Sequence, residues 1–133
     1  MVPLPRYTTI GGIPLPNLMD ADKIEAIVNR TKAGGGEIVK LEGTSAWYAP
    51  GAAAAEMVEA IVKNSGRILP CAVWLSGQYG EDGIFIGAPI RLGRNGVEEI
   101  IEVPLDESEQ ELMKSSAGHV RDNLAALERL ETA

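Results

Sequence analysis

An alternating run of apolar side chains constrains the fold of this chain more than any other feature. Every second residue is apolar in the run formed by Ile84, Ile86, Ala88, Ile90 and Leu92. A period of two places these side chains on one face of a β-strand. The run is followed by Asn95-Gly96, and an Asn-Gly pair is a strong signal for a tight turn between antiparallel strands. The sequence therefore predicts a hairpin whose second strand covers residues 97–103.

A third strand is predicted upstream of the hairpin, over residues 68–75. Its residues are apolar at nearly every position, which is typical of a strand covered on both faces. Residues 77–83 predict the turn that joins it to the hairpin. At the start of the chain, four prolines within eighteen residues favour short extended pieces and turns, with 7–10 as the best strand candidate.

Two helices are predicted between these regions. The first is capped by Asp20 or Asp22 and runs to about Lys32, with an apolar stripe that begins at Ile24. Gly34 to Gly36 are expected to loosen or end it, with a further turn or two over 37–41. The second helix covers 52–62 with Pro50 in its first turn, is apolar enough to be mostly buried, and stops at 64–66.

A long closing helix is predicted after the hairpin, with Asp106 or Ser108 as its N-cap. Apolar residues recur at alternating spacings of four and three along one seam: Met113, Ala117, Val120, Leu124 and Leu127. The order of elements is therefore strand signals, two helices, a three-strand meander and a long helix. This order predicts an α+β domain with a mostly antiparallel sheet over residues 1–133.

Composition narrows the classes of function. The chain of 133 residues carries a formal charge of −7 without clusters of Lys or Arg, which argues against nucleic-acid and anionic-membrane partners. It has no signal-peptide pattern at its start and no apolar run of the ~20 residues that a membrane helix needs. Cys71 is the single cysteine, so an internal disulfide is excluded and a cytoplasmic location is expected.

The residues do not form a complete catalytic site. His119, the one histidine, lies on the flank of the closing helix and is interpreted as a boundary or surface residue rather than a general base. Cys71 is interpreted as a small core residue. One histidine and one cysteine are too few for a zinc site, so no metal site is predicted. Glu98, Glu99 and Glu102 are interpreted as the solvated face of a hairpin strand.

No nucleotide-binding fingerprint is present either. Gly34-Gly35-Gly36 follows a predicted helix rather than a strand, and neither G-x-G-x-x-G nor G-x-x-x-x-G-K occurs in the sequence. The run from Gly43 to Gly51, with two hydroxyls and two aromatics ahead of a helix, is open to two interpretations. It can cap the helix and anchor a loop, or it can place free helix N–H groups near an anionic ligand.

Long stretches of the sequence resemble a known family. M-V-P-L-P-R-Y-T and G-G-I-P, then G-T-S-A-W-Y-A-P-G-A-A-A-A-E-M-V-E-A-I, then R-I-L-P-C-A-V-W-L-S-G-Q-Y-G, and finally I-F-I-G-A-P-I-R-L-G-R-N-G-V-E-E-I-I-E occur in this order. They resemble the C-terminal, substrate-side half of lactate-dehydrogenase-like bacterial malate dehydrogenases. The resemblance implies a lactate/malate dehydrogenase C-terminal fold without a Rossmann domain.

The resemblance also implies what the chain lacks. In the family a Gly-His-Gly-Asp motif with the catalytic histidine immediately precedes the Met-Val-Pro-Leu run, so the catalytic His, Asp and Arg are expected upstream of Met1. The Gly-rich NAD-binding domain is expected there too, and with it the loop that decides between malate and lactate. The complete enzyme would use NAD to interconvert malate and oxaloacetate. The chain alone is expected to bind no cofactor and to be inactive.

Six contact residues carry over by resemblance. Ser45 and Ala46 fall where the family lines the substrate pocket, and lactate dehydrogenases tend to have threonine at the position of Ala46. Tyr48 and Pro50 fall beside the nicotinamide, and Met1 and Val2 continue the wall next to the missing histidine.

Two alternatives to an enzyme half remain open. The chain can be a non-catalytic association module that complements a separate N-terminal half, or a truncation product. In either case it is expected to expose apolar surface and to self-associate into a homo-oligomer.

Overall fold

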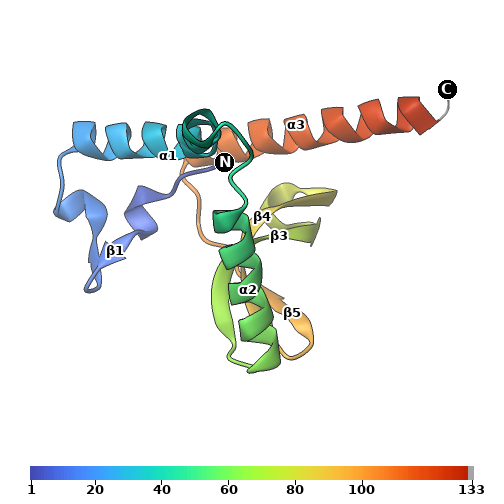
Figure 1. Ribbon diagram of the computed structural model, residues 1–133. Coiled ribbons are helices and arrows are strands. Elements are labelled where there is room, and N and C mark those ends of the chain that lie inside the picture. Colours follow the sequence, from blue (N-terminus) through green and yellow to red (C-terminus); the bar gives the residue numbers. More distant parts are fainter. Residues whose placement is uncertain (132–133) are drawn as a thin grey trace. The chain divides into compact units, whose positions relative to one another are not determined.

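The computed structural model describes residues 1–131, which form two compact units, Met1–Pro50 and the part of the chain from Gly51 onward (Figure 1). Helix α2, Tyr48–Val62, begins in the first unit and continues into the second. Each unit is described by itself. Among the described residues, no helix combines the length and the apolar character needed to cross a membrane.

The first unit opens with short elements, as the prolines predicted. A 3-10 turn, η1 (Pro5–Tyr7), is followed by β1 (Thr9–Ile10), β2 (Ile13–Pro14) and a second 3-10 turn, η2 (Leu15–Asn17). Strands β1 and β2 pair antiparallel, and the Gly11-Gly12 turn between them has φ of 58° and 84°. Positive φ at both central positions matches the twist of a tight hairpin and suits glycine. The strand predicted from Tyr7 starts at Thr9 instead, because Pro5 fixes the backbone of η1.

The first helix corrects the sequence prediction. Helix α1 runs without interruption over Ala21–Glu42, with Asp20 at the N-cap position, so Gly34 to Gly36 do not end it. Arg30 donates hydrogen bonds to Glu37 across the glycines, at 3.1 Å and 3.3 Å, and joins the turns on either side. The helix ends at Gly43, whose φ of 71° allows its N–H to reach the carbonyl of Val39. Of the predicted stripe only Ile24 is buried.

Two glycine substitutions are expected to have opposite effects on stability. A Cβ added at Gly35 meets nothing within 4 Å, so Gly35→Ala should raise the free energy of unfolding by about 0.5–1 kcal/mol through helix propensity. Gly43→Ala should lower it by about 1–2 kcal/mol, because an alanine at φ 71° is strained. Urea unfolding of both variants measures the difference. A destabilising Gly35→Ala would mean that another surface approaches this turn closely.

The second helix is less buried than its composition predicted. Of α2 only Ala60 is fully buried, while Val58 and Val62 are 58% and 73% exposed. A helix so apolar on its outer side is normally covered, and the described residues leave that side open. The predicted stop at 64–66 is confirmed: Asn64 and Gly66 have φ of 48° and 61°, and Ser65 N–H returns to the carbonyl of Ala60.

The predicted meander is confirmed. Strands β3 (Arg67–Ser76), β4 (Asp82–Gly93) and β5 (Gly96–Ile100) form an antiparallel sheet in the order β3-β4-β5. The five alternating residues of β4 are all buried: Ile84, Ile86, Ala88, Ile90 and Leu92. The prediction that β3 is covered on both faces is wrong, because Val73 and Leu75 are buried while Ile68 and Trp74 on the other face are 55% and 48% exposed.

The hairpin forms at the expected place but with a different turn. Gly93 pairs with Gly96, so the two loop residues are Arg94 and Asn95, and Gly96 has φ of 88°. Further along the hairpin, the register shifts between Arg91 and Leu92, as it does at a β-bulge. The returning strand ends at Ile100 rather than at 103, and residues 101–106 lead irregularly to the last helix.

The closing helix α3 (Glu107–Glu131) has the predicted N-cap. Asp106 accepts a hydrogen bond from Glu109 N–H at 2.9 Å, and the Glu109 carboxylate accepts one from Asp106 N–H at 2.9 Å. This reciprocal pair is a capping box. The predicted seam is buried in its first half, at Met113 and Ala117, and exposed in its second, where Leu124 and Leu127 are 43% and 53% exposed.

The α+β fold with an antiparallel sheet and a long last helix is therefore confirmed. In the second unit, α2 contacts the buried face of the sheet through Met57 and Cys71, and α3 packs against β4.

Candidate functional site

The predicted pocket residues Ser45 and Ala46 lie in a short connection between two helices. Helix α1 ends at Gly43 and α2 begins at Tyr48. Within the connection, Trp47 N–H donates a hydrogen bond to the carbonyl of Ser45 at 3.1 Å. Ser45 is exposed and Ala46 half-buried. This local turn presents the two small side chains at the start of α2, where helix N–H groups are not paired within the helix.

The residues predicted to lie beside the nicotinamide are mostly exposed. Tyr48 is 78% exposed at the first position of α2, and Pro50 is exposed in its first turn. Proline has no N–H to offer at that point, and the first turn contains no acidic side chain. Met1 is 72% exposed and Val2 half-buried, ahead of η1.

The structure brings together four of the six predicted residues. Ser45, Ala46, Tyr48 and Pro50 share one continuous stretch of backbone, whereas Met1 and Val2 stand at the beginning of the chain. No hydrogen bond described within residues 1–131 joins the two groups. Chemically, the stretch offers two hydroxyls, two small apolar side chains and two aromatic rings, from Ser45, Ala46, Trp47, Tyr48 and Ala49. Such groups can shape and orient a ligand, but none of them is an acid or a base near neutral pH.

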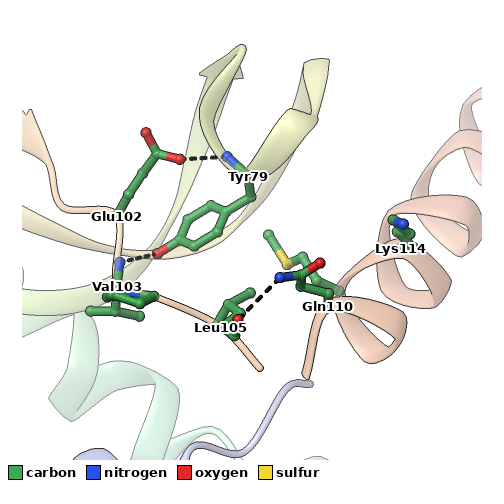
Figure 2. Close-up of a pocket in the computed structure, with 8 residues that line it drawn as sticks. Tyr79, Glu102, Val103, Leu105, Gln110 and Lys114 are labelled. Carbon is green, nitrogen blue, oxygen red and sulfur yellow. Dashed lines mark hydrogen bonds between the residues drawn. The ribbon is translucent and has the colours of Figure 1, made fainter. Parts of the chain in front are cut away.

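A second candidate site was missed by the sequence analysis. A hollow of 540 Å³ lies in the second unit between the residues after β5 and the start of α3 (Figure 2), lined by Tyr79, Glu102, Val103, Pro104, Leu105, Gln110, Met113 and Lys114. The sequence signal was weak: Tyr79 stands in a predicted turn, and Glu102 was interpreted as a solvated strand residue.

Tyr79 organises this hollow. Its φ of 55° is in the left-handed region, which costs a non-glycine residue energy. Its hydroxyl donates to the carbonyl of Ile101 at 3.1 Å and accepts from Val103 N–H at 3.0 Å, while its N–H donates to the Glu102 carboxylate at 2.7 Å. Figure 2 shows the contact of the Tyr79 hydroxyl with Val103 N–H and that of the Tyr79 N–H with Glu102. Glu102 is exposed, as interpreted, but it lies beyond the end of β5, and its carboxylate also accepts this backbone hydrogen bond.

The polar groups around the hollow mainly hold the backbone of the neighbouring segment in place through hydrogen bonds. Gln110 donates its side-chain N–H to the carbonyl of Leu105 at 3.1 Å, and Lys114 lies on the next turn of α3 (Figure 2). These contacts hold residues 101–105 against the start of α3. The hydrogen bonds of Tyr79 and Gln110 therefore support a structural role for the hollow.

Cys71 and His119, the single cysteine and the single histidine, lie on β3 and α3. Cys71 is half-buried with its Sγ 3.4 Å from Met57 Sδ. Burial, with a smaller contribution from Glu56, raises the pKa of the thiol, so the reactive thiolate is disfavoured. His119 is exposed on α3. Among residues 1–131, His, Cys, Asp and Glu side chains form no group of three or more that could hold a metal ion.

The sequence matches the family described as lactate/malate dehydrogenase, alpha/beta C-terminal domain, over residues 2–131. The chain belongs to this family. Its sequence is 65% identical over 130 residues to the malate dehydrogenase of Salinibacter ruber and 56% identical to that of Cytophaga hutchinsonii. These matches cover 98% of the chain but 41% and 42% of the two relatives, so the chain spans about two fifths of their length.

Solved structures agree with this family assignment. The malate dehydrogenase structure from Salinibacter ruber superimposes with a TM-score of 0.96 at 64% identity, covering 98% of this chain and 43% of that chain. The lactate dehydrogenase of Eimeria maxima, solved with NADH and oxamate, gives a TM-score of 0.92 at 37% identity, again over 98% of this chain and 43% of that chain. Within the family, the C-terminal domain thus accompanies both malate and lactate dehydrogenases.

Proposed function

We propose that residues 1–133 form the substrate-side domain of an NAD-dependent malate dehydrogenase, the part that follows the NAD-binding domain in the family. The observation that carries this proposal is the match to the Salinibacter ruber malate dehydrogenase, 65% identical over 98% of the chain. The complete enzyme interconverts malate and oxaloacetate with NAD as the hydride acceptor. It operates in the cytoplasm, consistent with the single, partly buried cysteine.

In that enzyme the chain contributes side chains that line the substrate pocket rather than the residues that transfer protons. Ser45 and Ala46 line the substrate pocket, and the small side chain of Ala46 leaves room for the second carboxylate of oxaloacetate. Tyr48 and Pro50 lie beside the nicotinamide ring, and Met1 and Val2 continue the wall. The histidine that exchanges the hydroxyl proton belongs to the other half, as the resemblance implies.

The residues of this chain do not fit the phosphates of NAD. Phosphate cradles need a glycine-rich loop between a strand and a helix, with backbone N–H groups pointing at the ligand. The three consecutive glycines, Gly34 to Gly36, lie within α1, where the N–H groups belong to the helix. Dinucleotide binding is therefore assigned to the NAD-binding half, and the 133-residue polypeptide alone is expected to be inactive.

A chimera tests the proposal. The part of the Salinibacter ruber malate dehydrogenase that precedes its matched region is joined to this chain, and NADH oxidation by oxaloacetate is measured beside the parent enzyme. We expect the chimera to be active and the isolated polypeptide to show no turnover, because acid–base assistance alone contributes roughly 10²–10⁴-fold. A folded, monodisperse chimera without activity would reject the proposal. Activity of the isolated polypeptide would reject the assignment of cofactor binding and acid–base chemistry to the NAD-binding half.

We further propose that the protein self-associates as a homo-oligomer. Large apolar residues are exposed on α2, on α3 and on the outer face of the sheet, and contiguous apolar surface of this kind marks an interaction site.

A further inference from the structure

The Asn95-Gly96 pair at the turn between β4 and β5 is distinctive in its chemistry as well as in its conformation. The carboxamide carbon of an asparagine can be attacked by the backbone nitrogen of the next residue, which closes a succinimide ring. A side chain on that next residue hinders the attack, and glycine has none. Among the asparagines of the sequence, Asn95 is the one that glycine follows.

The structure leaves the Asn95 carboxamide open to solvent. Asn95 is exposed, and within residues 1–131 its side chain has no hydrogen-bond or ionic partner. A Cβ added at Gly96 would meet nothing within 4 Å, so the space on that side of the backbone is open. Gly96 begins β5 and pairs with Gly93 at the end of the ladder, where strand pairing opens most readily.

Asn64 is also exposed, but its surroundings disfavour the same reaction. The nitrogen that would attack belongs to Ser65, and its N–H donates to the carbonyl of Ala60 at 3.0 Å. The Asn64 Oδ1 accepts a hydrogen bond from Arg94 N–H at 2.8 Å, which fixes the carboxamide. Both reacting groups are therefore held in place by other partners.

The remaining asparagines are disfavoured in the same way. The N–H of Leu18, which follows Asn17, donates to the carbonyl of Leu15 at 2.9 Å. Asn29 and Asn123 lie within α1 and α3, where the following N–H groups bond to carbonyls of the helix itself. A backbone nitrogen that is held as a donor is poorly placed to lose its proton and attack.

We propose that Asn95 is a site of spontaneous deamidation. The Gly96 backbone nitrogen gives up its proton to water and bonds to Cγ of Asn95, the bond from Cγ to the side-chain nitrogen breaks, and ammonia leaves. The succinimide then takes up one water and opens to aspartate or isoaspartate. The net reaction consumes water, releases ammonia and adds one negative charge to the −7 of the chain. It is independent of the function proposed above.

The isoaspartate product should loosen the tip of the hairpin. In isoaspartate the main chain runs through the side-chain carbon, which inserts one carbon between residues 95 and 96. The length of the turn sets the register of a hairpin, and here the turn is closed by the pairing of Gly93 with Gly96. The hydrogen bond from Arg94 N–H to Asn64, which ties the turn to the residues after α2, lies directly beside the insertion.

Ageing the full 133-residue chain at mildly alkaline pH tests the proposal, with circular dichroism to check the fold. Peptide mass spectrometry follows each asparagine, and labelling by an isoaspartyl methyltransferase detects the isomer. We expect Asn95 to convert at least ~10-fold faster than Asn64, a difference of about 1.4 kcal/mol in activation free energy. Asn95→Ser, which keeps a residue suited to turns, is the control and should give no label in the hairpin peptide.

Amide exchange measures the consequence for the hairpin. In the aged chain, exchange along β5 should be at least ~5-fold faster than in Asn95→Ser, as for the loss of one net hydrogen bond. Freshly prepared Asn95→Asp carries the added charge without the added carbon, and it should exchange like Asn95→Ser. Exchange as fast in fresh Asn95→Asp as in the aged chain would reject the inserted carbon as the cause.

Two results would overturn the deamidation site itself. One is faster conversion at Asn64 than at Asn95. The other is an Asn95 that survives in the folded chain but converts in the same chain unfolded in urea, because the pairing of Gly93 with Gly96 would then protect it. Neither result bears on the activity of the chimera, so failure of this inference and failure of the proposed function are distinguishable.

Discussion

Ala46→Leu in the chimera should lower kcat/KM for oxaloacetate by about 10–200-fold, because added methylene groups in a fitted pocket cost roughly that factor. Ala46 is half-buried in the connection between α1 and α2, so the larger side chain has little freedom to turn away from the proposed pocket. The loss should fall on the dicarboxylate more than on smaller 2-oxo acids such as pyruvate. Initial rates with both substrates measure the change in preference.

Two further variants sharpen this test. Ala46→Thr introduces the residue typical of lactate dehydrogenases and should shift the ratio of the two kcat/KM values in the same direction by a smaller factor. Ala125→Leu, at an exposed position of α3, is the control for an added leucine and should leave the ratio unchanged. Equal losses for both substrates in Ala46→Leu would indicate a folding defect rather than a pocket. An unchanged ratio would remove Ala46 from the pocket wall.

The features predicted well from the sequence are those in which neighbouring residues carry the whole signal. The alternation in β4 indicates its buried face because a strand repeats every two residues. The cap of α3 is a local exchange of hydrogen bonds between Asp106 and Glu109, so the spacing of these two residues was sufficient. The family resemblance likewise rests on contiguous runs of residues, and the match over residues 2–131 confirms it.

The wrong predictions concern the burial of α2 and β3, because burial depends on residues outside the helix or strand itself. An apolar composition indicates that α2 and the outer side of β3 should be covered, but it does not say that the cover lies within the same 133 residues. Val62 at 73% and Ile68 at 55% exposure show that residues 1–131 do not cover these two positions. The uninterrupted α1 is a different case: three glycines lower helix propensity by about 1 kcal/mol each, yet the helix continues, supported by the Arg30–Glu37 contact across them.

The hollow beside α3 was missed because its contacts join distant parts of the sequence. Tyr79 bonds to residues 22 and 24 positions away, and periodicity cannot reveal such a pairing. A polar-rich turn with a single tyrosine predicts a loop and nothing more.

The six contact residues carried over from the family remain predictions that the chimera variants address.

The ion pair between Glu81 and Arg121 should have the largest effect on stability of any charged pair described in this structure. Glu81 is 6% exposed at the turn before β4, and it accepts a hydrogen bond from Arg121 of α3, forty positions away. Arg121 lies where the buried half of the α3 seam ends, between Ala117 and the exposed Leu124. The pair therefore fixes α3 to the turn at the edge of the sheet.

Arg121→Ala should lower the free energy of unfolding by about 2–3 kcal/mol, because it leaves a buried carboxylate without its cation. This value is below the roughly 3–5 kcal/mol of a fully buried pair, since the Arg121 side chain is 48% exposed and already partly solvated. Arg30→Ala is the matched control: it breaks the exposed pair with Glu37, whose partners are 79% and 42% exposed, and should lower the free energy of unfolding clearly less than Arg121→Ala does. Urea unfolding measures both.

A double-mutant cycle separates the charge from the packing of the arginine stem. In a Glu81→Gln background the buried group is neutral, so Arg121→Ala should cost clearly less than it does with Glu81 present, with a coupling energy of about 1–2 kcal/mol. Amide exchange should quicken along α3 beyond residue 117 in the single Arg121→Ala variant, since the helix loses its attachment to the turn. If the two backgrounds give equal costs, the arginine acts through its apolar stem alone, and the buried carboxylate is satisfied without it.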